Sequence, residues 1–525
     1  MFDRRGKRFV KIVGVAVVMA VLLAVWLPGC GDDGDEGKQG VLVFGTGMSA
    51  GEGLNPNMIQ FSFATANAVY EKLVTYDNAK AEYVPTLATS WDVSEDGLTW
   101  TFHLREGVKF QDGSDLNADC FKYSYDVMLN GPQAYKFTAV ESMEVVDPMT
   151  VRFQLSYSYP LIYAISHAPF VVSTTAVDKL GDQAYEPGNR AGTGPYMVKA
   201  VNTTVETTLE RNPTYWGGWE GDHANAPDVL VIRMIQEAAP RVQNLTQNVV
   251  QLMHPVPETD VKTLQGNDKV QVHIQDTATC NVMHFNVNME PTDDVNFRQA
   301  LYYAVPFQDI VDIAHSGFAI PCSGFIGPNH YGYDKQLAEI GMHAQDLDKA
   351  REYLAKTKYP DGGVTINCIV DNAQAAGTRS MELYKTALAE LGITLEVQPL
   401  DINVIFEEGM SGPKHNIICI SKPGLADGVG TLEMDLQSQS LYNFTGWTDP
   451  RIDEIVAEAF GVMTKEPDKA VDLLLEADHI LMDNMPEVQL AYAQSLSAAS
   501  VDINYTGMID QQFMLPDYYN LWFKK

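Results

Sequence analysis

Apolar and polar residues alternate most clearly between Leu87 and Asp126. Every second residue from Leu98 to Leu104 is apolar, as in a strand with one buried face. Asp96 and Gly97 precede this strand and form a dipeptide that allows the positive φ of a tight hairpin turn. Asn117 is suited to cap a following helix, because its side chain can accept a hydrogen bond from a free backbone amide. The pattern predicts a β-hairpin that leads into a helix.

A second pattern begins near residue 347, where helical periodicity alternates with β-rich runs. Helices that alternate with strands are typical of α/β layering. Helices are expected at 348–356, 378–391, 404–410, 450–460 and 469–483, and strands at 364–370, 394–397 and 416–420. Elsewhere we expect a strand at 41–44, a helix at 67–73, a hairpin at 140–155 and a strand at 488–492 that returns to the first domain.

Residues 1–29 have the pattern of a targeting segment. Five basic residues precede an uncharged apolar run, Ile12–Trp26, and Leu-Pro-Gly then leads to Cys30. A small residue before a cysteine in this position resembles a bacterial lipobox, in which Cys30 is acylated and becomes the mature N-terminus. The alternative is an uncleaved membrane anchor, although the apolar run is short for one. Either reading places the body of the protein outside the cytoplasmic membrane.

Length and charge narrow the class of protein. With 525 residues the chain is too long for a single core, so two or three domains are expected. It has 36 Lys and Arg against 68 Asp and Glu, a net charge of −32. This charge argues against nucleic acid as a partner, because phosphate binding needs basic patches. An acidic surface favours solubility, and steering of cationic ligands is the alternative role.

A glycine-rich segment follows the expected strand at 41–44. Residues 47–51 fit the G-x-S-x-G spacing of a hydrolase around Ser49, and residues 45–50 resemble a dinucleotide-binding fingerprint. Both motifs require a helix directly after them, and residues 52–56 (Glu-Gly-Leu-Asn-Pro) cannot begin one promptly. We therefore expect a glycine loop beside a cleft, with no catalytic residue and no cofactor.

Histidines and cysteines do not form a metal-binding pattern. No two of the 11 histidines have the spacing of H-E-x-x-H, so no metal site is expected. The six cysteines are Cys30, Cys120, Cys280, Cys322, Cys368 and Cys419. If Cys30 carries lipid, five remain, and an odd number leaves at least one thiol free. Cys368 and Cys419 lie in apolar strands, where a buried thiol is the expected role.

The identity and order of the residues are more specific evidence of a protein family than the alternation of apolar and polar positions. Residues 87–113, L-A-T-S-W-D-V-S-E-D-G-L-T-W-T-F-H-L-R-E-G-V-K-F-Q-D-G, resemble the family 5 extracellular solute-binding proteins of bacterial ABC importers, the peptide- and nickel-binding group. Gly192–Tyr196 (G-T-G-P-Y), Leu209–Gly217 (L-E-R-N-P-T-Y-W-G) and Phe285–Leu301 resemble further motifs of that family. The resemblance extends over residues 45–525.

The resemblance implies an α/β fold, the type II periplasmic binding protein fold in its large three-domain form, with two lobes and a hinge. The expected parts are a signal peptide at 1–29, a lipid-anchored linker at 30–40, domain I at 41–75, 191–284 and 488–525, domain II at 76–190, and domain III, the second lobe, at 285–487. The hinge is expected where the chain crosses between lobes, near 192–196, 280–288 and 485–492.

The resemblance also suggests ligand-binding residues. Gly47 and Met48 belong to the loop that lies near the ligand. Arg379 matches an arginine that holds the ligand carboxylate in dipeptide-binding relatives, a role that suits a guanidinium fork. Asp427 aligns with an aspartate that pairs with the ligand ammonium, but the Trp and the Asp-Pro of the relatives' W-x-A-D-x-x-D-P segment are absent. The ordinary alternatives are a solvated Arg379 at a helix start and a turn role for Asp427.

One disulfide is suggested in the same way. Cys280 corresponds to a cysteine that is disulfide-bonded in some peptide-binding relatives, although the relatives' partner position holds no cysteine here. Cys322 or Cys419 is the expected partner.

The implied function is capture of a solute without catalysis. A short peptide is the leading ligand, while a metal chelate, an opine or an organic acid remain open. A sensory or adhesive lipoprotein and a hydrolase that uses Ser49 are the alternatives from other classes. The expected partners are the permease and ATPase subunits of an ABC importer, and the membrane through the lipid anchor. The protein is expected to be a monomer, in the periplasm or on the outer face of the cytoplasmic membrane.

Overall fold

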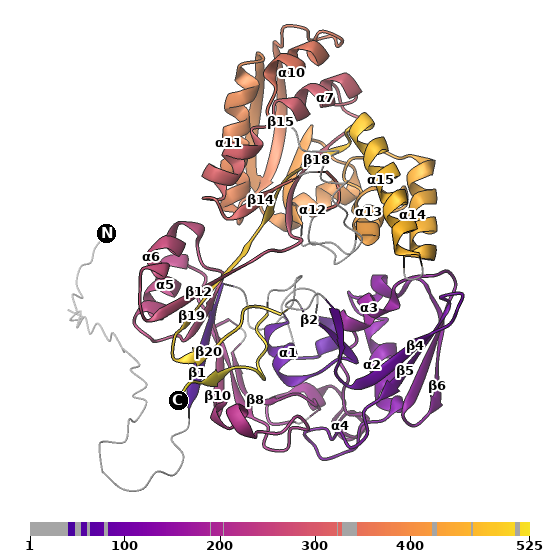
Figure 1. Ribbon diagram of the computed structural model, residues 1–525, viewed down its shortest axis with the longest axis vertical. Helices are drawn as coiled ribbons and strands as arrows, with labels where there is room; N and C mark the ends of the chain where they lie inside the picture. Colours follow the sequence, from indigo (N-terminus) through magenta and orange to yellow (C-terminus); the bar gives the residue numbers. More distant parts are fainter. Residues whose placement is uncertain are drawn as a thin grey trace, which may run out of the picture. The chain divides into compact units, whose positions relative to one another are not determined.

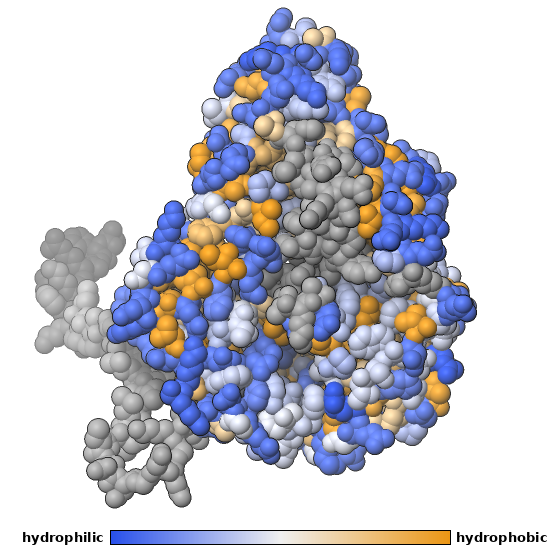
Figure 2. Space-filling view, in the orientation of Figure 1, coloured by the Kyte–Doolittle hydropathy of each residue, from blue (hydrophilic) through white to orange (hydrophobic). Residues whose placement is uncertain are grey.

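The computed structural model describes residues 40–47, 54–59, 63–77, 82–189, 191–202, 204–322, 324–327, 344–422, 428–463, 466–509 and 515–525. Residues 39–525 form one compact unit. We call β1–β12 and β19–β21, with the helices between them, the first lobe. We call β13–β18, with α7–α15, the second lobe (Figure 1). On the face shown in Figure 2, hydrophilic residues predominate and hydrophobic ones form small groups.

A seven-stranded sheet forms the centre of the first lobe. Its central strand β1 runs parallel to β10 and β11, and the remaining pairs are antiparallel. Leu42 and Phe44 pack into the core on one face of the sheet, and Val43 packs into the core on the other. The strand order is β12 (Val270–Gln275), β19 (Ser495–Ser500), β11 (Leu252–His254), β1 (Val41–Thr46), β10 (Val229–Met234), β9 (Glu206–Arg211) and β8 (Tyr196–Asn202).

A four-stranded sheet confirms the hairpins expected from the sequence. Its order is β4 (Ala88–Val93), β5 (Thr99–Leu104), β7 (Thr150–Leu155) and β6 (Val140–Asp147). Gly97 adopts a φ of 73° in the first turn. Trp100 and Phe102 are buried, as their alternation predicted. The Asn117 side chain caps α2 (Ala118–Met128) by accepting a hydrogen bond from Cys120 N at 3.1 Å.

The second lobe contains a six-stranded sheet covered by the helices expected after residue 347. Its order is β14 (Ala319–Pro321), β18 (Glu487–Ala493), β13 (Cys280–Phe285), β17 (Ile417–Lys422), β15 (Val364–Asp371) and β16 (Ile393–Leu400). The alternation is confirmed by α10 (Leu347–Leu354), α11 (Ala375–Ala389) and α12 (Ile402–Ser411), which separate these strands along the chain (Figure 1). Asp294 caps α7 (Val295–Tyr303) by accepting a hydrogen bond from Asn296 N at 2.8 Å.

The other elements are shorter or lie at the edges. They are η1 (Pro56–Met58), α1 (Ala64–Val69), β2 (Val74–Asp77), β3 (Glu82–Pro85), η2 (Ala134–Phe137), α3 (Leu161–His167), α4 (Thr174–Leu180), η3 (Gly181–Tyr185), η4 (Gly221–Asn225), α5 (Ala238–Thr246), η5 (Glu258–Asp260), α6 (Val261–Gln265), α8 (Phe307–Asp309), η6 (Ile310–Ala314), α13 (Gly428–Leu436), α14 (Pro450–Val462), α15 (Pro467–Asn484), β20 (Ile503–Asn504) and β21 (Trp522–Phe523). The buried core of the four-stranded sheet continues into α13, α14 and α15, so apolar packing joins the two lobes on that side.

Two expectations differ from the structure. The helix expected at 67–73 is displaced, because α1 already ends at Val69. The strand expected to return to the first domain, 488–492, lies in β18 of the second sheet, between β13 and β14. The chain re-enters the first sheet only with β19. Where the domains divide stays a prediction.

Candidate functional site

The family-like motifs meet at the turn that follows α1. Gly194 N donates a hydrogen bond to the carbonyl oxygen of Val69, the last residue of α1, at 2.9 Å. A Cβ on Gly192 or Gly194 would overlap the Val69 carbonyl group, so both positions require glycine. Gln111, which belongs to the motif at residues 87–113, donates from its side chain to the same oxygen at 3.3 Å. These long-range contacts end the helix early and set the course of residues 70–73.

Glu71 connects this turn to the motif at Leu209–Gly217 through hydrogen bonds. Its carboxylate accepts hydrogen bonds from the Tyr215 hydroxyl and the Trp216 indole nitrogen, each at 2.8 Å. The Arg105 guanidinium lies 4.6 Å from the centre of the Trp216 ring. Burial raises the pKa of Glu71 to about 7, although Trp216, Thr193, Tyr215 and Arg105 all lower it. Glu71 is therefore a buried structural link between the motifs.

The turn forms one wall of a cavity of about 480 Å³, which we call the first-lobe cavity. This size lies in the range of pockets that hold small organic ligands, roughly 300–1,000 Å³. Tyr76 and Tyr83 meet edge to face with ring centres 5.1 Å apart, and Tyr215 and Tyr519 do so at 5.0 Å. The lining is mostly aromatic and polar: Tyr70, Tyr76, Tyr83, Tyr215, Trp216, Tyr518 and Tyr519 with Asn67, Glu71, Lys72, Thr75, Thr86, Ser166, His167 and Asp517.

The polar groups of this cavity include one cation and one neutral histidine. Lys72 Nζ lies 3.4 Å from Asn67 Oδ1 and 5.0 Å from the centre of the Phe170 ring. Burial lowers the pKa of His167 well below 6.5, and Lys136 and Lys72 lower it further, so the imidazole is neutral at pH 7. Lys72 is only 7% exposed, and the carboxyl groups of Glu71 and Asp517 also line the cavity, so the lining offers an organic solute aromatic faces and mixed polar groups.

Gly47 lies at the end of β1, next to the first-lobe residue Arg241. A Cβ on Gly47 would lie 2.9 Å from Arg241 Nη1, and the same Nη1 donates to the carbonyl oxygens of Ile235 and Gln236, each at 2.7 Å. A side chain at this position would require the Arg241 guanidinium to shift. Met48 and Ser49 lie outside the described residues, so a ligand role for Gly47 and Met48 stays a prediction.

Arg379 contacts protein groups from both lobes. Its Nη2 lies 2.5 Å from Glu258 Oε2, and its guanidinium also donates to the carbonyl oxygen of Ala314. The other oxygen of Glu258 lies 3.2 Å from His315 Nδ1, while His315 Nε2 lies 2.9 Å from the Asn281 amide nitrogen. This fixes the tautomer, because Nδ1 must donate to the carboxylate and Nε2 must accept from the amide. Arg379 thus joins α11 to η5, and its role toward a ligand stays a prediction.

Asp427 lies outside the described residues, but both sides of its segment are described. Lys422 ends β17 just before it, and Lys422 Nζ lies 2.6 Å from Asp435 Oδ1 on α13, which begins just after it. The two side chains are 9% and 2% exposed. This ion pair connects the strand and the helix on either side of residues 423–427. A ligand role for Asp427 stays a prediction.

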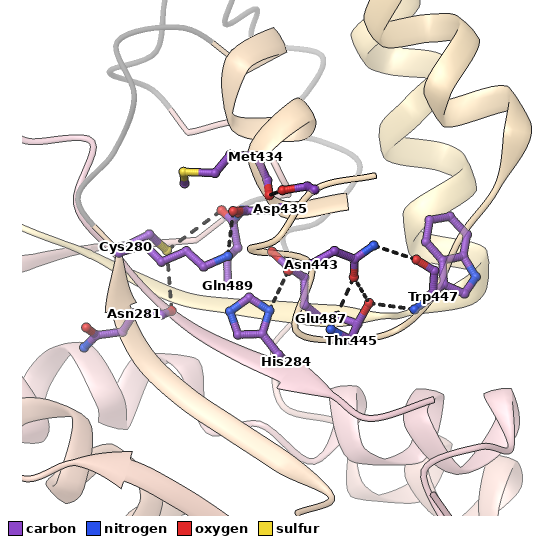
Figure 3. Close-up of polar contacts among 12 residues, drawn as sticks. Cys280, Asn281, His284, Met434, Asp435, Asn443, Thr445, Trp447, Glu487 and Gln489 are labelled. Atoms are coloured by element: carbon purple, nitrogen blue, oxygen red, sulfur yellow. Dashed lines mark hydrogen bonds and ion pairs between the residues drawn. The ribbon is translucent and has the colours of Figure 1, made fainter. Parts of the chain in front are cut away.

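Two further titratable residues lie beside this pair. Figure 3 shows His284 and Glu487 together near Asp435, and His284 Nδ1 lies 2.9 Å from Glu487 Oε2 with both side chains fully buried. Burial raises the pKa of Glu487 to about 7 and of Asp435 to about 6, and Lys422 lowers both. Burial, aided by Lys422, lowers the pKa of His284 well below 6.5.

None of the described cysteines is disulfide-bonded in the structure. Cys280 and Cys322 belong to one small buried cluster, and both Sγ atoms contact Gln489 Oε1, at 3.8 and 3.5 Å. Burial raises the pKa of the Cys280 thiol, and the neighbouring Cys322 adds to the shift. Cys419 instead lies near Cys368. A disulfide between Cys280 and Cys322 stays a prediction, to be checked by mass spectrometry after alkylation without reductant.

The sequence analysis missed Glu71, Lys422 and Asp435. A weak signal was present for Lys422, since it directly follows the apolar run Ile417–Ile420 and Ser421. Its pairing with Asp435 across the intervening segment could not be foreseen. Among the described residues, no cluster of three or more His, Cys, Asp or Glu could hold a metal ion, and no helix is long and apolar enough to span a membrane.

Two lobes, each built on its own large sheet and joined where the chain passes from β12 to β13 and from β18 to β19, agree with a solute receptor of the periplasmic-binding-protein class. The family model of the bacterial extracellular solute-binding proteins, family 5, matches residues 82–421, and the chain belongs to that family. The family consists of solute-binding proteins of ABC transporters and not of enzymes, so the hydrolase alternative at Ser49 is excluded.

Relatives and solved structures agree with this assignment. The glutathione-binding protein GsiB of Salmonella typhi is 28% identical over 476 residues, which cover 87% of this chain and 88% of that protein. The periplasmic binding protein DppA from Helicobacter pylori, solved with the peptide STSA, has a TM-score of 0.75 at 22% identity and covers 93% and 98% of the two chains. AgaA from A. tumefacien R10, solved with agropinic acid, has a TM-score of 0.75 at 20% identity, covering 93% and 99%. At these identities, the two structures support the fold alone.

Proposed function

We propose that this protein is a lipid-anchored receptor that captures a short peptide between its lobes and delivers it to the permease of an ABC importer. The observation that carries the proposal is membership of family 5 over residues 82–421. The names of GsiB and DppA point to glutathione and peptide as ligands of similar proteins. The first-lobe cavity has aromatic walls and a volume suited to a small organic ligand.

The proposal is tested by identifying the ligand. Mass spectrometry of solute that co-purifies with the protein is followed by unfolding of the stripped protein with dipeptides, tripeptides and glutathione. A ligand at a hundred times its dissociation constant stabilises the bound form by about 2.7 kcal/mol, which raises the melting temperature. A full panel of peptides that leaves the melting temperature unchanged contradicts peptide capture.

Peptides with blocked termini test the predicted ligand-binding roles of Arg379 and Asp427. If these residues hold the ligand carboxylate and ammonium, blocking either terminus weakens binding by roughly 1.5–3 kcal/mol per lost charged hydrogen bond. Binding of the ligand carboxylate would then require Arg379 to release its ion pair with Glu258. Equal affinity for free and doubly blocked peptides removes both residues from the site.

A non-peptide solute is the second candidate, favoured by the similarity to AgaA in complex with agropinic acid. The missing Trp and Asp-Pro around Asp427 agree with a ligand other than a standard dipeptide. Binding of an opine with no response to any peptide would select this candidate.

The anchor is proposed from residues 1–30. Cys30 becomes the acylated N-terminus, the protein acts as a monomer on the membrane surface, and it presents its ligand to permease and ATPase subunits. Cys30→Ala should release the protein from the detergent phase or stall its processing. Intact residues 1–29 on protein from cells would contradict the lipobox assignment.

A further inference from the structure

A second cavity, of about 560 Å³, lies between the two lobes, and we call it the inter-lobe cavity. Its first wall consists of η2, the chain after β7 and α3, and its second wall consists of α13, the turn at residues 437–442 and α14. It shares no residue with the first-lobe cavity. It is therefore a separate space whose shape depends on both lobes.

The wall from the first lobe presents aromatic rings. Tyr157 and Tyr159 meet edge to face with ring centres 6.5 Å apart, and Tyr159 contacts Phe460 of the second lobe at 5.1 Å. Lys136 is only 3% exposed, and its Nζ lies 5.5 Å from the centre of the Tyr163 ring. Because this cation is buried against a ring, the surface open to a ligand is chiefly aromatic.

The wall from the second lobe adds flexible apolar groups. Leu441 is 70% exposed, the largest exposure among the large hydrophobic residues that the structure describes as exposed. Met434, Gln437 and Ser440 also line this wall, and Glu433 adds a carboxyl group whose influence the Ala-Arg-Ala peptide below tests. An exposed leucine gains free energy when an apolar group covers it, and methionine adapts to partners of different shape.

We propose that the inter-lobe cavity is a second ligand subsite, which takes one aromatic or bulky aliphatic side chain of the captured peptide. This inference rests on the proposed function and specifies which peptides the receptor prefers. A ring inserted here packs edge to face against Tyr157 and is covered by Leu441, so the subsite selects for size and apolarity. Since the walls come from different lobes, the side chain binds best when both walls are together, and it thereby favours the closed arrangement.

The test compares tripeptides that differ only in the central residue: Ala-Gly-Ala, Ala-Trp-Ala and Ala-Arg-Ala. Calorimetry should show Ala-Trp-Ala binding at least about tenfold more tightly than Ala-Gly-Ala, as burial of a large apolar side chain implies. Leu441→Ser and Tyr157→Ser should each lower that ratio severalfold and leave Ala-Gly-Ala unaffected. Val404→Ser and Val205→Ser change valines that are each 48% exposed and lie outside both cavities, so they should preserve the ratio.

Several results overturn the subsite: an unchanged ratio in Leu441→Ser and Tyr157→Ser, equal weakening of both peptides, or a preference for Ala-Arg-Ala. If none of these tripeptides binds, the full peptide panel decides the proposed function, and N-acetyl-tryptophanamide decides the subsite separately. Binding of this amide to the unmodified protein that Leu441→Ser abolishes supports the subsite. No binding of the amide to the unmodified protein overturns it.

Discussion

Two ion pairs of nearly equal length lie in very different surroundings. Lys422 Nζ and Asp435 Oδ1 are 2.6 Å apart inside the second lobe, with side chains 9% and 2% exposed. Arg379 Nη2 and Glu258 Oε2 are 2.5 Å apart between the lobes, with side chains 39% and 20% exposed. The first pair connects the segments on either side of Asp427, whereas the second connects η5 to α11.

The difference in burial decides what each pair contributes to stability. Burial raises the pKa of Asp435 to about 6 even though Lys422 lowers it, so loss of hydration outweighs the attraction of the cation. A buried pair is consequently weak evidence of stabilisation, but loss of one partner leaves an unpaired charge. A partly exposed pair is screened by water and salt, and it typically contributes between 0 and about 1 kcal/mol. The distance between charges is thus a poor guide to their energy.

The largest effect is expected for Lys422→Met. The substitution leaves Asp435 buried without its cation, and the free energy of unfolding should fall by about 3–5 kcal/mol, measured by urea unfolding at pH 8. The double variant Lys422→Met with Asp435→Leu removes both charges and should recover most of the loss. A double variant no more stable than the single one would show that the pair is needed for more than charge compensation.

The next effect is a pH dependence that arises from Glu487. Its pKa is raised from 4.5 in the unfolded chain to about 7 by burial, while Lys422 and Gln489 lower it. Between these values the folded protein binds more protons than the unfolded chain, so this group lowers stability as the pH rises from about 4.5 to about 7. Glu487→Gln should remove that loss, and its stability relative to the unmodified protein should increase by about 2–3 kcal/mol over the window.

The comparison with Glu487→Gln isolates this group from its neighbours. Asp435 titrates in the same direction, and His284, whose pKa is lowered, acts in the opposite direction below pH 6.5. Both remain in the variant, so the difference in urea midpoint between the two proteins reports on Glu487. The exposed Glu95→Gln serves as the matched control and should give parallel pH profiles. Parallel profiles for Glu487→Gln as well would contradict a titration of this carboxyl group.

A smaller effect is expected for the pair between the lobes. Glu258→Gln removes the charge that Arg379 and His315 share, and it should change the free energy of unfolding by roughly 0–1 kcal/mol at 0.15 M salt. The change should shrink further in 1 M salt, where charges are screened within about 3 Å. A loss as large as that of Lys422→Met would mean that the inter-lobe contact is far more enclosed than its exposure indicates.

Local interactions explain why parts of the fold were predictable from the sequence. The turn at Gly97 and the cap by Asn117 depend on residues within a few positions, so the pattern predicted them correctly. The end of α1 was not predictable, because Gly194 and Gln111 determine it from 125 and 42 residues away. The sheet that receives β18 was likewise missed, since an alternating strand does not identify its neighbours.

The candidate site was less predictable than the fold. Arg379 could be named from its resemblance, but its partner Glu258 lies 121 residues earlier, and nothing in the local pattern joins them. The aromatic lining of both cavities comes from segments that are distant in the chain, so composition alone could not assemble it. Motifs such as G-T-G-P-Y identified the family, and their residues make the structural contacts around Val69 and Glu71. Because these contacts are within the protein, the motifs give little information about the ligand.

The smallest effect is expected for Arg451, which extends the comparison to a network whose carboxylates are more exposed than Glu258. Arg451 on α14 contacts Glu454, Glu458 and Glu476 at 3.1, 3.0 and 2.7 Å, and these carboxylates are 63%, 51% and 45% exposed. Water replaces these contacts readily, so Arg451→Gln should leave the urea midpoint unchanged within measurement error at 0.15 M salt. A count of ion pairs would instead predict a larger loss of stability for Arg451→Gln than for Lys422→Met, because Arg451 has three partners and Lys422 has one. If Arg451→Gln destabilised the protein as much as Lys422→Met, the number of partners, and not burial, would determine the contribution of an ion pair here.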